Sequence, residues 1–255
     1  MSSLKHPASL FEGRKAIVSG GSRGIGSAVA QRLIDGGAQV AVLARSRHPQ
    51  TPAEALFIEV DLSCESGVTV AAEHAVRELG GLDILINNAG AGQPQLPDSS
   101  AITDRQWVDS LNINLMAAVR LTTAVLSTLK RSEFGVIINL SAGCATPAPG
   151  AMLHYLSAKA ALNTYSLGLG NELAPYGIRV NVVTPGPISS PGGDAFRKVI
   201  LDAMDMDVQA MVEQVPLRRL GTTQEVADMI AFLVSDQGRW LTMHNYFVDG
   251  GMAAL

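Results

Sequence analysis

The chain of 255 residues lacks the features that mark several specialised protein classes. Its two cysteines, Cys64 and Cys144, are too few for a disulfide framework, and neither stands in a cluster with metal-ligand spacing. No apolar run reaches the roughly 18 residues that cross a bilayer, and the start of the chain lacks a basic-then-apolar leader. The net charge of −4 gives no reason to bind nucleic acid or an anionic membrane. These absences predict a soluble, cytoplasmic protein without a metal.

Apolar residues are plentiful, at 47% of the chain against 16% charged residues, which is typical of a globular protein. Short β-rich runs alternate with longer amphipathic stretches. We predict strands over Lys15–Ser19, Gln39–Ala44, Leu56–Val60, Leu82–Ile86, Val136–Leu140, Arg179–Val183 and Tyr246–Val248. We predict helices over Gly24–Asp35, Ser66–Leu79, Asp104–Lys130, His154–Leu173 and Thr223–Val234. This alternation predicts a single α/β domain over residues 1–255, with a Rossmann-like, doubly wound parallel sheet of about seven strands and helices on both faces.

One stretch breaks the alternation. Residues 189–215 contain a Pro-Gly-Gly run and three methionines, and they precede Pro216. Long irregular segments in compact domains often cover a binding site. We therefore expect a substrate lid here.

A glycine-rich turn joins the first predicted strand to the first predicted helix. It reads Ser19-Gly20-Gly21-Ser22-Arg23-Gly24-Ile25-Gly26. Glycines let the backbone turn tightly and approach a pyrophosphate, which the positive end of the helix attracts. In this position the turn predicts a dinucleotide site, and the alternative, a plain tight turn, is the weaker interpretation.

The end of the second predicted strand bears on which dinucleotide binds. An enzyme that uses NAD usually places an acid there to hold the ribose 2′-hydroxyl. This chain has Ala44 instead, followed by Arg45, Ser46 and Arg47. A guanidinium can hold a 2′-phosphate, and Arg23 of the glycine turn can approach the same group. We therefore predict NADP(H) in preference to NAD(H); the alternative is that Arg45 and Arg47 are ordinary solvated charges.

Tyr155 and Lys159 are four residues apart and lie on one face of their predicted helix. An ammonium beside a phenol favours the phenolate and so lowers the pKa of the tyrosine. Tyr155 is thus a candidate proton donor or acceptor. The pair alone is weak evidence, because this spacing occurs by chance in many helices.

Taken together, these motifs resemble the short-chain dehydrogenase/reductase family over nearly the whole chain, and in particular its 3-oxoacyl-carrier-protein reductase-like members. The resemblance implies further cofactor contacts beyond the glycine turn. They are Asp61 and Leu62 at the adenine, Asn88, Ala89 and Gly90 beside the cofactor, and Pro185, Gly186, Ile188 and Ser190 at the nicotinamide carboxamide.

The resemblance also implies the chemistry, which is the interconversion of a carbonyl and a secondary alcohol by an NADP(H)-dependent enzyme. Tyr155 would be the general acid/base, Lys159 would hold the nicotinamide ribose, and Asn114 would hold a proton-relay water. The expected substrate is a small molecule or an acyl chain on a carrier protein. A homo-oligomer, tetramer or dimer, is expected from the same resemblance.

One position departs from the family pattern. The family serine stands thirteen residues before the tyrosine, where this chain has Ala142, and Ser141 lies one position earlier. The side chain of Ser141 would point the other way on an extended segment, so a structural hydroxyl is its favoured interpretation. Three accounts stay open: Ser141 turns inward, a water or substrate hydroxyl replaces the serine, or catalysis has decayed and the protein binds NADP(H) for a regulatory or assembly role.

Overall fold

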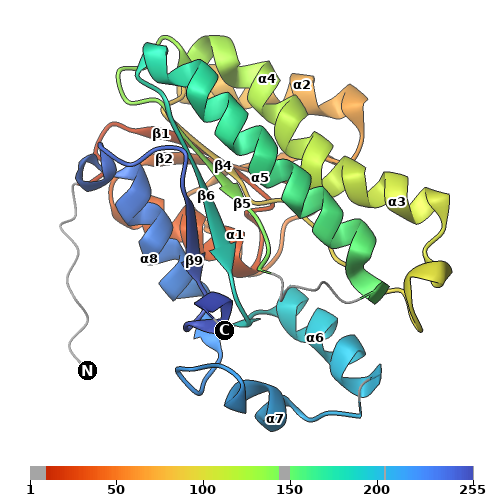
Figure 1. Cartoon of the computed structure of the whole chain (residues 1–255). Coiled ribbons are helices and arrows are strands. Elements are labelled where there is room, and N and C mark those ends of the chain that lie inside the picture. The colour runs from red at the N-terminus through yellow and green to blue at the C-terminus, as the bar shows by residue number, and fades with distance from the viewer. Residues whose placement is uncertain (1–9, 144–149, 204, 255) are drawn as a thin grey trace.

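The computed structural model describes residues 10–143, 150–203 and 205–254, and in them a parallel sheet of seven strands forms the centre of the molecule (Figure 1). The strand order is β3-β2-β1-β4-β5-β6-β9, and every neighbouring pair is parallel. The strands are β1 (Lys15–Ser19), β2 (Gln39–Ala44), β3 (Leu56–Glu59), β4 (Ile84–Asn87), β5 (Val136–Leu140), β6 (Arg179–Pro185) and β9 (Asn245–Val248). The predicted fold class is confirmed.

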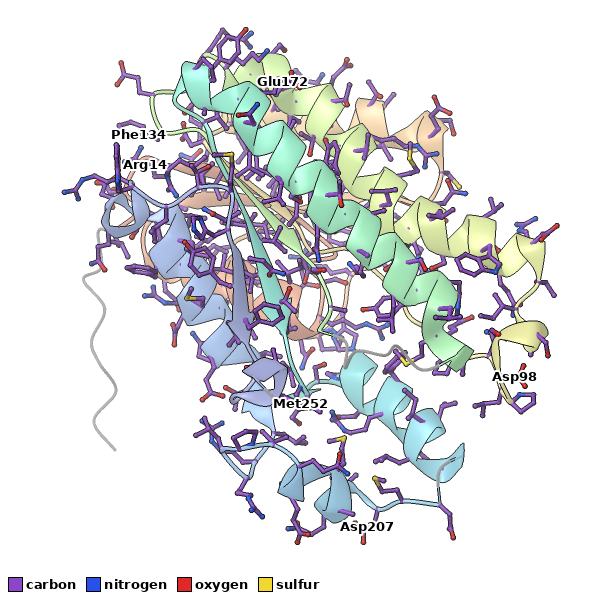
Figure 2. The ribbon with its side chains drawn as sticks, viewed as in Figure 1. Arg14, Asp98, Phe134, Glu172, Asp207 and Met252 are labelled. Atoms are coloured by element: carbon purple, nitrogen blue, oxygen red, sulfur yellow. The ribbon has the colours of Figure 1, made fainter. Side chains whose placement is uncertain are left out.

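Helices cover both faces of this sheet, and side chains fill the two layers between them (Figure 2). One core joins the sheet to α1 (Gly24–Asp35) and α8 (Thr223–Val234). The other joins it to α2 (Glu65–Leu79), α4 (Ala117–Leu129) and α5 (Leu153–Leu173). Because both faces are covered, the central strands are apolar in succession instead of alternating, and all five residues of β5 are buried. Among the described residues, no helix is long and apolar enough to cross a bilayer.

The order of the strands reverses between β1 and β4. The chain builds outward from β1 to β2 and β3, then returns to add β4 on the other side of β1. In open α/β sheets, ligands bind in the crevice at the carboxyl ends of the strands at such a reversal. The fold therefore places a binding site where β1 ends at Ser19 and β4 ends at Asn87.

The sequence predicts one helix over residues 104–130, and the structure divides it. Helix α3 (Asp104–Leu111) begins at a capping box formed by Thr103 and Gln106, and a π-helical turn at Asn112–Met116 separates it from α4. Such turns are rare and often mark functional sites. Here the turn holds Asn114, the residue for which a relay role is expected.

The predicted lid region, residues 189–215, forms two helices that lie below the main body in Figure 1. They are α6 (Pro191–Ala203) and α7 (Val208–Glu213), while Met204 lies outside the described residues. A two-stranded parallel pair, β7 (Ile188–Ser189) with β8 (Gly221–Thr222), flanks them. The sequence did not predict these helices because α6 opens on Pro-Gly-Gly, a pattern typical of a turn.

Candidate active site

The glycine turn has the backbone shape that the sequence predicts. Gly20 and Gly24 have φ values of +65° and +59°, in the left-handed region that favours glycine. At Gly26 the requirement is space, because a Cβ there would stand 2.4 Å from both the carbonyl oxygen of Gly20 and Nδ2 of Asn88. Ser22, Arg23 and Ile25 lie in the same turn, at the N-terminus of α1.

Asn88 fastens the glycine turn to the end of β4. Its Nδ2 donates to the carbonyl oxygens of Ser19, at 2.9 Å, and Gly20, at 3.1 Å. In return, Ser19 Oγ accepts from the backbone N–H groups of Asn88 and Ala89, both at 3.0 Å. The two sides of the strand reversal are thus tied together, and the structure brings these predicted cofactor residues into one site.

The connection 45–55 between β2 and β3 has no helix, although parallel crossovers usually contain one. It lies instead over the glycine turn. Gln50 Oε1 accepts from the Gly24 N–H at 3.1 Å, Ser27 Oγ donates to the Gln50 carbonyl, and Thr51 Oγ1 donates to the Ser22 carbonyl at 3.2 Å. Gln50 therefore caps α1, whose own N-cap residue, Arg23, makes no side-chain capping bond. Gln50 was not predicted from the sequence; the short spacing between β2 and β3 was the available signal.

The two basic residues after β2, Arg45 and Arg47, are both exposed but differ in their contacts. Arg45 and Ser46 lie beside the glycine turn, which carries the exposed Arg23. Arg47 is engaged within its own loop, where Nη2 donates to the Pro52 carbonyl at 3.4 Å and the guanidinium lies 5.8 Å from the centre of the Phe57 ring. Arg45 and Arg47 are thus not equivalent candidates for a 2′-phosphate.

Asp61 and Leu62, the expected adenine contacts, follow β3 in different settings. Hydrogen bonds from the Ser63 hydroxyl and N–H hold the pKa of the Asp61 carboxyl below its usual range, and the charge of Arg45 lowers it further. Leu62 is 4% exposed and packs into the core beneath the sheet. Any contact of Leu62 with a cofactor would therefore come from its main chain.

Two of the expected proton-transfer residues, Asn114 and Lys159, meet at Gly90. Lys159 is buried on α5, and its Nζ donates to the Leu140 carbonyl at 2.8 Å. The Asn114 amide is held by the main chain of Ala91, with bonds of 2.8 and 3.0 Å. A Cβ on Gly90 would stand 2.9 Å from Asn114 Oδ1 and 3.1 Å from Lys159 Nζ. Tyr155 stands one turn before Lys159 on the same helix.

Ser141, the doubtful catalytic candidate, follows β5 and is buried. Its N–H donates to the Val183 carbonyl at 2.9 Å, and its hydroxyl lies 3.5 Å from the carbonyl oxygen of Lys159, at the limit of a hydrogen bond. The hydroxyl thus faces the backbone of α5. This geometry favours a structural role for Ser141 and counts against the account in which Ser141 turns inward to replace the missing serine.

The segment after β6 supplies the opposite wall of the crevice. Gly186 is anchored by its N–H to the Val248 carbonyl at 3.0 Å, and a Cβ on it would stand 2.6 Å from Asp249. A Cβ on Gly24 would stand 3.7 Å from the Cβ of Ser190. Ser190 therefore lies across from the glycine turn, and Pro185, Gly186 and Ile188 precede it in the chain.

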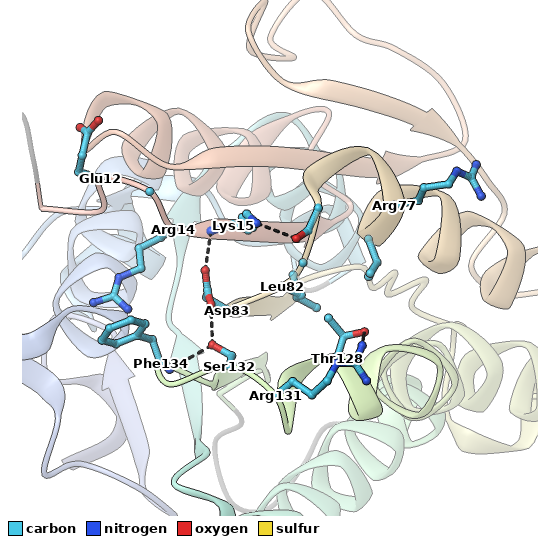
Figure 3. Close-up of a pocket in the computed structure, with 14 residues that line it drawn as sticks. Glu12, Arg14, Lys15, Arg77, Leu82, Asp83, Thr128, Arg131, Ser132 and Phe134 are labelled. Carbon is cyan, nitrogen blue, oxygen red and sulfur yellow. Dashed lines mark hydrogen bonds between the residues drawn. The ribbon is translucent and has the colours of Figure 1, made fainter.

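A cavity of about 660 Å³ lies at the opposite, amino end of the strands (Figure 3). Two of its charged side chains contact their neighbours. Asp83 accepts from the Lys15 N–H at 2.9 Å and from the Ser132 hydroxyl at 2.5 Å, and Arg14 stacks on Phe134, 3.1 Å from the ring centre. We assign this cavity no part in the candidate site.

The burial of Lys159 has a consequence for stability. Burial lowers the pKa of Lys159 to about 8, whereas a lysine in an unfolded chain titrates near 10.4. Below pH 8 the folded protein carries the full cost of a buried ammonium; this cost falls as the pH rises from about 8 to about 10, because the unfolded chain then binds more protons. Lys159→Met should therefore raise the free energy of unfolding by about 1–3 kcal/mol at pH 7, with a smaller gain at pH 10.

Urea unfolding at both pH values measures this effect. Lys198→Met, at an exposed site on α6, is the matched control and should change stability by less than about 0.5 kcal/mol. A loss of stability in Lys159→Met at pH 7 would show that the hydrogen bond to Leu140 outweighs the cost of desolvation.

The fold and the site together define a class of protein, the nucleotide-dependent oxidoreductases with a Rossmann-like sheet. The family model described as enoyl-(acyl carrier protein) reductase matches residues 20–253. The chain belongs to the short-chain dehydrogenase/reductase family.

Three relatives illustrate this membership. The 3-oxoacyl-acyl-carrier-protein reductase FabG of Escherichia coli is 35% identical over 249 residues, which cover 95% of this chain and 98% of the relative. A short chain dehydrogenase from Burkholderia cenocepacia, solved in complex with NADP, is 30% identical with a TM-score of 0.83, covering 95% of this chain and 99% of that one. Ligand-free Thermoplasma acidophilum aldohexose dehydrogenase is 27% identical with a TM-score of 0.87, covering 98% of this chain and 97% of that one.

Proposed function

We propose that this protein is an NADP(H)-dependent oxidoreductase that interconverts a carbonyl and a secondary alcohol, with Tyr155 as general acid/base. The observation that carries the proposal is the meeting of Asn114 Oδ1 and Lys159 Nζ at Gly90, beside the helix that bears Tyr155. This cluster lies at the carboxyl ends of the strands, next to a turn shaped for a dinucleotide.

The residues at this edge fit the dinucleotide. The N-terminus of α1 and the glycine turn would hold its diphosphate, Arg23, Arg45 and Ser46 its 2′-phosphate, and Lys159 its nicotinamide ribose. The bound dinucleotide supplies or accepts the hydride.

Proton transfer is the task of the chain itself. In the reducing direction Tyr155 gives its proton to the substrate oxygen, and the ammonium of Lys159 stabilises the phenolate that remains. Asn114 completes the path along which Tyr155 regains a proton. Arg45 in place of an acid favours NADP(H), and NADP(H) preference in turn favours reduction in the cell.

The relatives support a proposal for the substrate class. The printed name of the Escherichia coli relative is that of a reductase of 3-oxoacyl groups on a carrier protein. We propose a small or carrier-bound carbonyl as substrate, and a homo-oligomer, tetramer or dimer, of the cytoplasm as the working form.

The test is direct. Purified protein should bind NADPH more tightly than NADH, and should oxidise NADPH in the presence of at least one member of a panel of ketones and 3-oxoacyl thioesters. The proposal fails if NADPH binds no more tightly than NADH and no member of the panel is reduced.

A second function, binding of NADP(H) without significant catalysis, is favoured by one observation, Ala142 at the family serine position. The variant Ala142→Ser separates the two functions. If the site is adapted to its own substrate, restoring the hydroxyl leaves kcat/KM unchanged or lowers it. If catalysis has decayed, kcat/KM rises from near zero by on the order of 10², because one donor to the reacting oxygen contributes that much.

A further inference from the structure

Helix α6 brings an aromatic ring to the helix that bears Tyr155. The ring of Phe196 lies 6.0 Å from the ring of Tyr155, centre to centre, with the planes tilted by 54°. This separation is within the contact range of aromatic pairs. The lid region and the proposed general acid are therefore in contact through Phe196.

The same ring rests on a glycine of the loop after β4. A Cβ on Gly92 would stand 2.7 Å from Cε2 and 3.2 Å from Cδ2 of Phe196. The φ value of Gly92 lies outside the left-handed region, so its backbone does not require glycine. Position 92 must instead lack a side chain because the ring of Phe196 occupies that space. We call Gly92 the seat of this ring.

This seat is part of the site. Gly92 follows Ala91, whose main chain holds the amide of Asn114 through two hydrogen bonds. The next residue on α6, Arg197, is buried and paired with Asp194 of the same helix. Phe196 therefore lies at the edge of the site, packed on Gly92 and in contact with Tyr155.

From this geometry we propose that Phe196 selects substrates by the width of the carbon beside the reacting carbonyl. This proposal rests on the proposed function. The substrate oxygen has to come within about 3 Å of the Tyr155 hydroxyl. A methylene beside the carbonyl passes the ring, whereas a carbon bearing two methyl groups collides with it. The substrate class is thus a 3-oxo ester or thioester in which the carbon between the two carbonyls is an unbranched methylene.

Ethyl acetoacetate and ethyl dimethylacetoacetate test the proposal, because they differ only in two methyl groups beside the ketone. The wild-type protein should reduce the unbranched ester preferentially. Phe196→Ala should raise the ratio of kcat/KM for the branched ester over the unbranched one by at least about tenfold, the scale on which pockets discriminate such groups. Val199→Ala, at an exposed position of the same helix, should leave the ratio unchanged.

A second variant tests the seat. Gly92→Ala displaces the ring and should also raise the ratio, but it should have no further effect in the Phe196→Ala background, since coupled residues are not additive. An unchanged ratio in Phe196→Ala, or additive effects of the two substitutions, overturns the proposal.

The outcome is separable from that of the proposed function. Absence of turnover of either ester by every variant counts against the function. The dissociation constants of the two esters for NADP⁺-loaded protein, which need no turnover, then decide the proposal. If Phe196→Ala leaves the ratio of the two dissociation constants unchanged, the proposal for Phe196 is wrong.

Discussion

Replacing Tyr155 with phenylalanine should lower kcat/KM for carbonyl reduction by on the order of 10²–10⁴, the contribution of a positioned general acid. Only the hydroxyl is removed, so the ring contact with Phe196 and the packing of α5 should persist. The measurement is the rate of NADPH oxidation with any substrate of the panel, together with the dissociation constant of NADPH, which should change little.

Tyr176→Phe is the matched control, because Tyr176 is exposed just after α5 and stacks under Lys130 instead of facing the site. It should keep the wild-type rate. If Tyr155→Phe also kept its rate within a factor of about ten, the proton would come from another group, and the assignment of Tyr155 would be wrong.

Replacing Arg45 with alanine should weaken NADPH binding by roughly 10- to 100-fold, since hydrogen bonds to charged groups contribute about 1.5–3 kcal/mol. Binding of NADH, which has no 2′-phosphate, should change little. Fluorescence titration of both dinucleotides measures the preference.

Arg47→Ala is the control that the structure provides. Arg47 is committed to the Pro52 carbonyl and the Phe57 ring, so its loss should affect NADPH and NADH alike. If Arg45→Ala instead weakened the binding of NADPH and NADH equally, the role of Arg45 would be to support Asp61. Arg23 and Ser46 would then hold the 2′-phosphate.

The sequence was sufficient to predict the architecture because the signals of its core elements are local and agree with one another. The bounds of Lys15–Ser19, Gly24–Asp35, Gln39–Ala44, Val136–Leu140 and Thr223–Val234 match the structure residue for residue. In each case a buried apolar run or an amphipathic helix is bounded by glycine, a capping residue or a turn, so local preference and tertiary packing favour the same structure.

What the sequence did not show depends on contacts between distant segments. Gln50 caps a helix that begins 26 residues earlier in the chain. Phe196 meets Gly92 and Tyr155 only because three elements converge at one edge of the sheet. The direction of the Ser141 hydroxyl likewise depends on how α5 packs against β5. Such pairings leave no periodic pattern, so reasoning from the sequence cannot find them.

The π-helical turn at Asn112–Met116 has a mechanical consequence for the column formed by α3 and α4. Each residue of an α-helix rotates the chain by about 100°, so the wider turn resets the angular phase of everything beyond it. Here α3 packs against α5, whereas α4 packs against α2. The π-helical turn thus lets α3 and α4, which follow one another in the chain, pack against two different helices. Asn114 lies in this turn. Deletion of one residue from the turn would therefore rotate either the packing face of a helix or the Asn114 amide away from its present contacts.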